Sequence, residues 1–132
     1  MAIRVTFPGG RRVDADFDGE LIRTDQSRLS GGEGSAPAPF RLFLASIGTC
    51  AGIYVLSFCQ GRNLPTDGIE IIQEQAYDES GGRLAKVTIT INVPPHFPAK
   101  YHRALVRAAN LCTVKKAISD PPEFEVTTST GP

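Results

Sequence analysis

The feature that most constrains this chain is an uncharged segment that runs from Leu42 to Gly61. An apolar run of about 18 residues or more is the usual mark of a membrane-spanning helix. This run does not fit that class well, because it is diluted by Ser46, Gly48, Thr49, Gly52, Ser57 and Gln60. A helix that is apolar on nearly all faces needs cover on every side. We therefore expect no membrane insertion, and a homodimer in which a second copy helps to cover this helix.

The segments on either side of this helix predict an α+β fold with mainly antiparallel strands. Strands are predicted at 3–7, 11–17 and 20–25, and the Asp18-Gly19 pair is a strong hairpin signal. A mobile Ser/Gly/Ala/Pro loop is expected at 26–38, with Pro39 near the first turn of the helix and the helix end near Gly61. The remaining expected elements are a hairpin over 68–80 and 83–94, a helix at 99–111, a helical turn at 113–119 and a strand at 123–129. The predicted order is βββ-α-ββ-α-β in a single domain, 1–132.

Composition excludes several classes of function. The chain has 14 basic and 14 acidic residues and no tryptophan, so it lacks the basic surface expected of a nucleic-acid-binding protein. The N-terminal segment has no apolar core of a signal peptide and does not resemble an Arg/Ser-rich presequence, so we expect a cytoplasmic protein. In that reducing compartment, cysteines are more often catalytic or metal-binding than structural disulfides.

Cys50 and Cys112 are the candidate reactive residues. They lie far apart in two helix-like segments and can meet only in the folded chain. The alternative is that Cys50 is a small apolar filler, since free cysteines are among the most frequently buried residues. Cys59 is expected to be filler, because it lies near the end of the helix and opposite in phase to Cys50.

Two motifs resemble the OsmC/Ohr family. These are Pro39-Phe40-Arg41-Leu42-Phe43-Leu44-Ala45-Ser46-Ile47-Gly48-Thr49-Cys50 before the uncharged helix, and Leu111-Cys112-Thr113-Val114 near the C-terminal end. The resemblance implies an intertwined homodimer around two long central helices. It also implies that Cys50 matches the peroxidatic cysteine and Cys112 the resolving cysteine of proteins that reduce organic hydroperoxides, with an external dithiol as reductant.

One position departs from the pattern of the peroxidase branches. Those branches have a glutamate after the proline, paired with an arginine near the active cysteine, whereas this chain has Phe40. Phe40 is closer to the OsmC-like branch without this glutamate, and the candidate arginines here are Arg11 and Arg12. Because burial raises the pKa of a thiol, Cys50 needs a positive charge or hydrogen-bond donors to react at neutral pH. Cys50 lies about three turns into its own helix, so another segment or a partner subunit must supply them.

Other chemistry is poorly supported. His96 and His102 lack the spacing of a zinc site, and the glycine-rich loop SGGEGS has no phosphate-binding context, so we expect no metal and no cofactor. The leading hypothesis is a cytoplasmic thiol peroxidase that uses Cys50 and Cys112. The alternative is a non-catalytic dimer of the same fold that binds a small apolar or thiol-reactive molecule. Phe40 favours the alternative, and Cys112 favours the enzyme.

Overall fold

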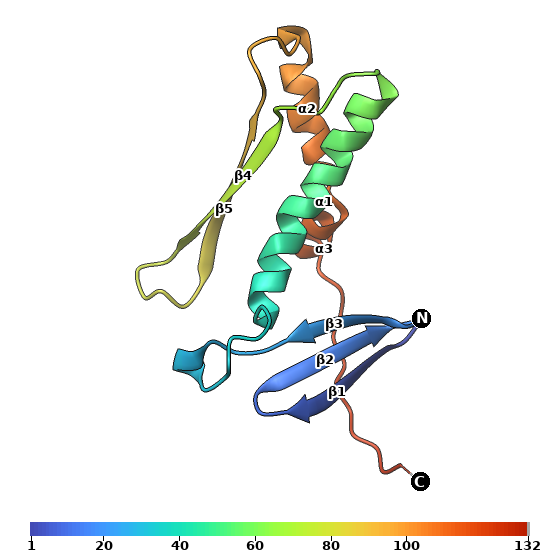
Figure 1. The fold of residues 1–132 in the computed structure, drawn as a ribbon, viewed down its shortest axis with the longest axis vertical. Helices are drawn as coiled ribbons and strands as arrows, with labels where there is room; N and C mark the ends of the chain where they lie inside the picture. The colour runs from blue at the N-terminus through green and yellow to red at the C-terminus, as the bar shows by residue number, and fades with distance from the viewer. Residues whose placement is uncertain (132) are drawn as a thin grey trace. The chain divides into compact units, whose positions relative to one another are not determined.

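The computed structural model describes residues 1–131 and divides the chain into two compact units. The first covers Met1–Ser46, and the second begins at Ile47. The long helix α1 (Pro39–Gly61) starts in the first unit and contributes most of its length to the second (Figure 1).

The first unit contains the predicted antiparallel meander. Its strands are β1 (Ile3–Gly9), β2 (Arg12–Phe17) and β3 (Glu20–Thr24), in the order β1-β2-β3. The β2–β3 turn uses Asp18 and Gly19, both with positive φ, and Phe17 pairs with Glu20 across it. These are the backbone conformations that a tight hairpin requires, so the Asp-Gly prediction is confirmed.

The loop after β3 is held by a buried carboxylate. Asp25, 1% exposed, accepts hydrogen bonds from the backbone N–H groups of Gln26 (2.7 Å), Glu33 (3.3 Å) and Ser35 (3.0 Å), and from the Ser35 hydroxyl (2.6 Å). A side chain at Gly32 would collide with the Gln26 carbonyl and the Asp25 carboxylate. The segment expected to be a mobile loop is therefore organised around Asp25, and it contains the short 3-10 helix η1 (Arg28–Ser30).

Asp25→Asn should weaken the fold in a pH-dependent way. Hydrogen bonds, first from the Ser35 hydroxyl and then from backbone N–H groups, lower the pKa of Asp25 from 3.8 to about 2. A carboxyl group with a lowered pKa stabilises the fold fully above the unfolded-state value, and this contribution is lost as pH falls through the folded-state value. The urea concentration at the midpoint of unfolding should be higher for the wild type than for Asp25→Asn at pH 6. This difference should shrink as pH falls from about 4 to about 2.

Asp16→Asn is the matched control, because the Asp16 carboxylate accepts one bond, from Gly19 N–H at 2.9 Å, at an exposed turn. It should change the midpoint less than Asp25→Asn does. Equal effects of the two substitutions at all pH values would contradict the role given to Asp25.

The second unit combines the rest of α1 with a hairpin and two shorter helices. The hairpin strands are β4 (Glu70–Tyr77) and β5 (Leu84–Asn92), paired antiparallel. The 3-10 helix η2 (Ala99–Tyr101) leads into α2 (His102–Ala109), and α3 (Thr113–Ser119) follows. The helix predicted at 99–111 is thus shorter and begins as a 3-10 helix, and the predicted helical turn at 113–119 forms α3.

The core of the second unit lies between one face of α1, the hairpin and α2. Its buried centre is Val55, Cys59, Phe97 and Leu105. The buried residues of α1 recur every four positions, at Ile47, Ala51, Val55 and Cys59, as expected for one helical face. By length and composition α1 could also cross a membrane, a test that core helices of soluble proteins pass as well. In the described chain, only the face with these four residues is buried.

The predicted strand at 123–129 is wrong for the chain described here. Residues 121–131 form no helix or strand, and Phe124 and Val126 are 84% and 94% exposed. Local alternation of apolar and polar residues favours an extended backbone, but a strand forms only when a neighbour completes its hydrogen bonds. No neighbouring strand of the described chain pairs with this segment.

Candidate functional site

The second unit brings Cys50 and Cys112 together. Cys50 lies on α1, and Cys112 lies directly before α3, where it is the N-cap residue. Their side chains share a hydrogen bond, and both thiols are free. The structure therefore brings together the two cysteines that the sequence singled out.

The start of α3 supplies hydrogen-bond donors to Cys50. The first N–H groups of a helix have no partner within it, and here those of Thr113 and Val114 bond to the Cys50 sulfur. The pKa of Cys50 is lowered, chiefly by the Val114 N–H, against an opposing effect of burial, with smaller contributions from Cys112 and the Thr113 N–H. The donors come from another segment, as the position of Cys50 in its own helix required.

Cys112 has the opposite environment. It is 2% exposed, whereas Cys50 is partly exposed. Its sulfur accepts a hydrogen bond from the Lys115 N–H at 3.4 Å, and its thiol donates to the Ile47 carbonyl at 3.9 Å. Burial is the main cause that raises the pKa of Cys112, and the neighbouring Cys50 raises it further. Cys112 is therefore a protonated thiol over the pH range in which Cys50 begins to ionise.

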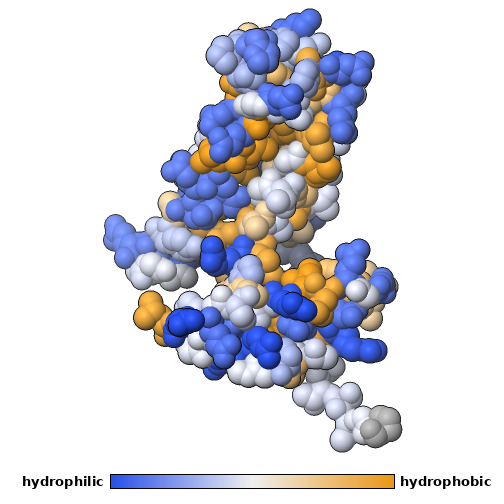
Figure 2. All heavy atoms as spheres, in the orientation of Figure 1, coloured by the Kyte–Doolittle hydropathy of each residue, from blue (hydrophilic) through white to orange (hydrophobic). Residues whose placement is uncertain are grey.

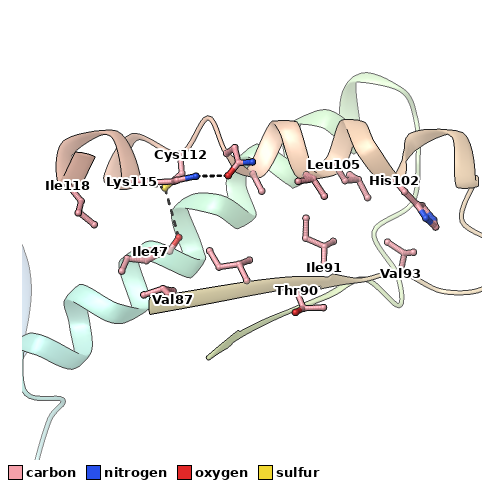
Figure 3. Close-up of a pocket in the computed structure, with 14 residues that line it drawn as sticks. Ile47, Val87, Thr90, Ile91, Val93, His102, Leu105, Cys112, Lys115 and Ile118 are labelled. Carbon is pink, nitrogen blue, oxygen red and sulfur yellow. Dashed lines mark hydrogen bonds between the residues drawn. The ribbon is translucent and has the colours of Figure 1, made fainter. Parts of the chain in front are cut away.

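An apolar cavity of about 650 Å³ borders Cys112 (Figure 3). It lies between the hairpin, α2, α3 and α1, and Cys50 is not among its lining residues. Its polar side chains include His102, Asn110 and Lys115, and the Lys115 ammonium is hydrogen-bonded to Asn110 Oδ1 at 2.6 Å. Pockets of roughly 300–1,000 Å³ suit small organic molecules. The apolar wall is formed by Ile47, Val87, Ile89, Ile91, Val93, Leu105, Val106, Ala109 and Ile118.

The third cysteine, Cys59, which was expected to be core or surface filler, belongs to the core. Cys59 is fully buried, and burial raises its pKa. Among residues 1–131, no group of three or more His, Cys, Asp or Glu side chains is placed to hold a metal ion.

Phe40, Arg11 and Arg12, which the resemblance compares with the glutamate and arginine of the peroxidase branches, lie in the first unit. Phe40 is half exposed, and its ring packs on that of Phe43 with 5.4 Å between centroids. Arg11 and Arg12 lie at the exposed β1–β2 turn, where Arg12 Nε donates to the Gly9 carbonyl at 3.4 Å. Phe40 has no group that can accept a hydrogen bond from an arginine.

The sequence did not identify the donors at Thr113 and Val114. Every residue except proline carries a backbone N–H, so side-chain identity does not mark the ones that are free. The available signal was the position of Cys112 directly before a short helical segment, which leaves the following N–H groups without helical partners.

Solved structures share this fold. A protein from Psychrobacter arcticus 273-4, named for osmotic stress and detoxification responses, is 23% identical, with a TM-score of 0.70 over 89% of this chain and 87% of that chain. An organic hydroperoxide resistance protein, OsmC, from Legionella pneumophila is 20% identical, with a TM-score of 0.57 over 89% of each chain. The organic hydroperoxide resistance protein OhrB of Bacillus subtilis is 23% identical, with a TM-score of 0.56 over 92% and 93% of the two chains.

Sequence comparison with curated proteins gave no match. A family model described as OsmC-like protein, however, matches residues 32–127. This range is most of the chain, and it includes both cysteines, α1 and the hairpin. The α+β fold with antiparallel sheets and a long central helix, expected from the sequence, agrees with this match and with the solved structures. The chain belongs to the OsmC-like protein family.

Proposed function

We propose that this protein is a cytoplasmic, cofactor-free thiol peroxidase that reduces organic hydroperoxides with Cys50 and Cys112. The observation that carries the proposal is the pair of free, hydrogen-bonded thiols whose pKa values shift in opposite directions. A peroxidatic cysteine must be a thiolate, and its partner must remain available until the first step is complete. Cys50 fits the first requirement and Cys112 the second.

The reaction begins at the Cys50 thiolate. The thiolate attacks the terminal oxygen of the hydroperoxide, an S–O bond forms, and the O–O bond breaks. The alkoxide leaves and takes a proton to become an alcohol, while Cys50 is oxidised to a sulfenic acid. Cys112 then attacks the Cys50 sulfur, the S–O bond breaks, and hydroxide leaves with the Cys112 proton as water. An external dithiol reduces the resulting disulfide by thiol–disulfide exchange.

The cavity beside Cys112 supports an organic substrate. Its walls are mainly aliphatic, so a peroxide with a hydrocarbon group would gain from burial there, whereas hydrogen peroxide has no apolar surface to bury. The Legionella and Bacillus relatives are named for resistance to organic hydroperoxides, which also supports this class. Consumption of cumene hydroperoxide by the protein with a dithiol present tests the proposal.

The competing function is a non-catalytic dimer that binds a small apolar or thiol-reactive molecule. Two observations favour it: the cavity, and Phe40 at the place where the resemblance puts the glutamate of the peroxidase branches. A protein of this kind would bind its ligand without consuming peroxide, and Cys50 would stay unoxidised in excess cumene hydroperoxide.

The pKa of Cys50 should lie below that of an ordinary cysteine but above the pKa of strongly activated thiols. Backbone N–H donors lower it, whereas Phe40 cannot orient a guanidinium near it. The rate of iodoacetamide alkylation at Cys50, followed by mass spectrometry, should rise with pH through this value. Cys59 is the internal control, because burial raises its pKa and it should react slowly throughout. A Cys50 pKa as low as that of a strongly activated thiol would show that a further group activates it.

A further inference from the structure

Three positions on one face of α1 hold the turn that begins α3. The Ile47 carbonyl accepts a hydrogen bond from the Cys112 thiol, and the Cys50 sulfur accepts bonds from the first N–H groups of α3. One turn further along, the Tyr54 hydroxyl is 3.0 Å from Thr113 Oγ1. Residues spaced by three and four positions share a helix face, so these contacts form one continuous strip.

The Tyr54 contact acts on the same residue that serves Cys50. Thr113 is the first residue of α3, and its N–H is one of the two backbone donors to the Cys50 sulfur. A hydrogen bond at the Thr113 side chain restrains the position of the Thr113 backbone. It thereby also restrains the N–H group of the next residue, Val114.

We propose that Tyr54, through its hydrogen bond to Thr113, is a positioning residue that keeps the N–H groups of Thr113 and Val114 directed at the Cys50 sulfur. The inference rests on the proposed function in one respect, namely that Cys50 is the nucleophile. Tyr54 is not among the groups that shift the pKa of Cys50, and it acts through Thr113.

The other titratable groups at this turn are few. Cys112 bonds to Cys50, and Lys115 carries the one formal charge among the first three residues of α3. The Lys115 ammonium is bound to Asn110 Oδ1 at 2.6 Å, and the groups that lower the pKa of Cys50 are backbone N–H groups and the Cys112 side chain. The thiolate therefore depends on the placement of neutral donors. Such bonds weaken steeply when their angle or length departs from the optimum.

Tyr54→Phe tests the proposal, because it removes one oxygen and leaves the ring. In protein that also carries Cys59→Ser, the pH profile of Cys50 alkylation should move to higher pH. Below the pKa, alkylation should slow by roughly twofold to tenfold, the range that corresponds to loosening one hydrogen bond. The melting temperature is measured in parallel. A profile identical to that of the parent protein would overturn the proposal.

Two matched variants separate positioning from a general loss of packing. Thr113→Ser keeps the hydroxyl and should retain the parent profile, whereas Thr113→Val should reproduce the shift of Tyr54→Phe, with no further change in the double variant. Tyr77→Phe removes a tyrosine hydroxyl from β4 and should leave the profile unchanged. A shift of the same size in Thr113→Ser or Tyr77→Phe would refute a specific Tyr54–Thr113 effect.

The alkylation assay uses no peroxide, so it separates this inference from the proposed function. A shifted profile in Tyr54→Phe, with no hydroperoxide consumption by the wild type, would support the positioning role and reject the peroxidase. Hydroperoxide consumption by the wild type with an unshifted profile in Tyr54→Phe would support the peroxidase and reject the positioning role.

Discussion

Cys50→Ser should lower the rate of organic hydroperoxide consumption by roughly a thousandfold or more, because a serine hydroxyl cannot replace the thiolate nucleophile at neutral pH. The wild type, treated with one equivalent of cumene hydroperoxide and digested without reductant, should show a disulfide between Cys50 and Cys112. The rate of peroxide consumption is followed by the remaining peroxide, which oxidises ferrous iron in the presence of an iron-binding dye. Mass spectrometry identifies the oxidised residues.

The other two cysteines provide the controls for this experiment. The Cys112→Ser variant should still consume one equivalent of peroxide, but its reaction should stop at a Cys50 sulfenic acid. Excess peroxide then oxidises this group to the sulfinic acid. Cys59→Ser should behave as the wild type, since Cys59 lies in the core, apart from the hydrogen-bonded pair. An unmodified Cys50 in wild-type protein after excess cumene hydroperoxide would favour the ligand-binding function instead.

Light scattering at micromolar concentration should give twice the mass of the chain. Ile53 on α1 is 52% exposed, and Val106, Leu111 and Ile118 in the same unit are each about half exposed. Figure 2 shows apolar side chains, in orange, at the surface of this unit. Covering each large aliphatic side chain stabilises an interface by roughly 1.5–3 kcal/mol. We therefore expect an obligate homodimer with a mainly apolar interface.

Ile53→Asp should shift the protein toward the monomer, because the interface would then bury an unpaired carboxylate. Leu29→Asp is the control: Leu29 is fully exposed in the short helix η1 of the first unit, and the substitution should leave the mass unchanged. A monomeric mass for the wild type at micromolar concentration would contradict the dimer.

Local patterns were sufficient for most elements of the fold. The positive φ angles at Asp18 and Gly19 follow from the residue types, so the first hairpin could be predicted without knowledge of its surroundings. The end of α1 at Gly61 could also be predicted, because the helix breakers Asn63, Pro65 and Gly68 follow it, and Asn63 has a positive φ. In contrast, Phe124 and Val126 alternate as in a strand yet remain unpaired in the described chain.

The candidate site was predictable only in part. The resemblance singled out Cys50 and Cys112, and the uncharged surroundings of Cys50 indicated that it needed donors from elsewhere. The order of residues could not show that Asp25 is buried within a ring of N–H groups, nor that Tyr54 reaches Thr113. These contacts join residues that are ten and 59 positions apart, respectively.

The sequence therefore determined the helices, the hairpins and the identity of the two thiols, because turn residues, periodicity and residue chemistry act over a few neighbouring positions. Tertiary structure alone decided which thiol ionises first. Cys50 and Cys112 are the same residue type with the same unperturbed pKa, and they differ only in what folding places around them. Free N–H groups at the start of α3 stabilise a negative charge on Cys50, whereas nearly complete burial of Cys112 disfavours one.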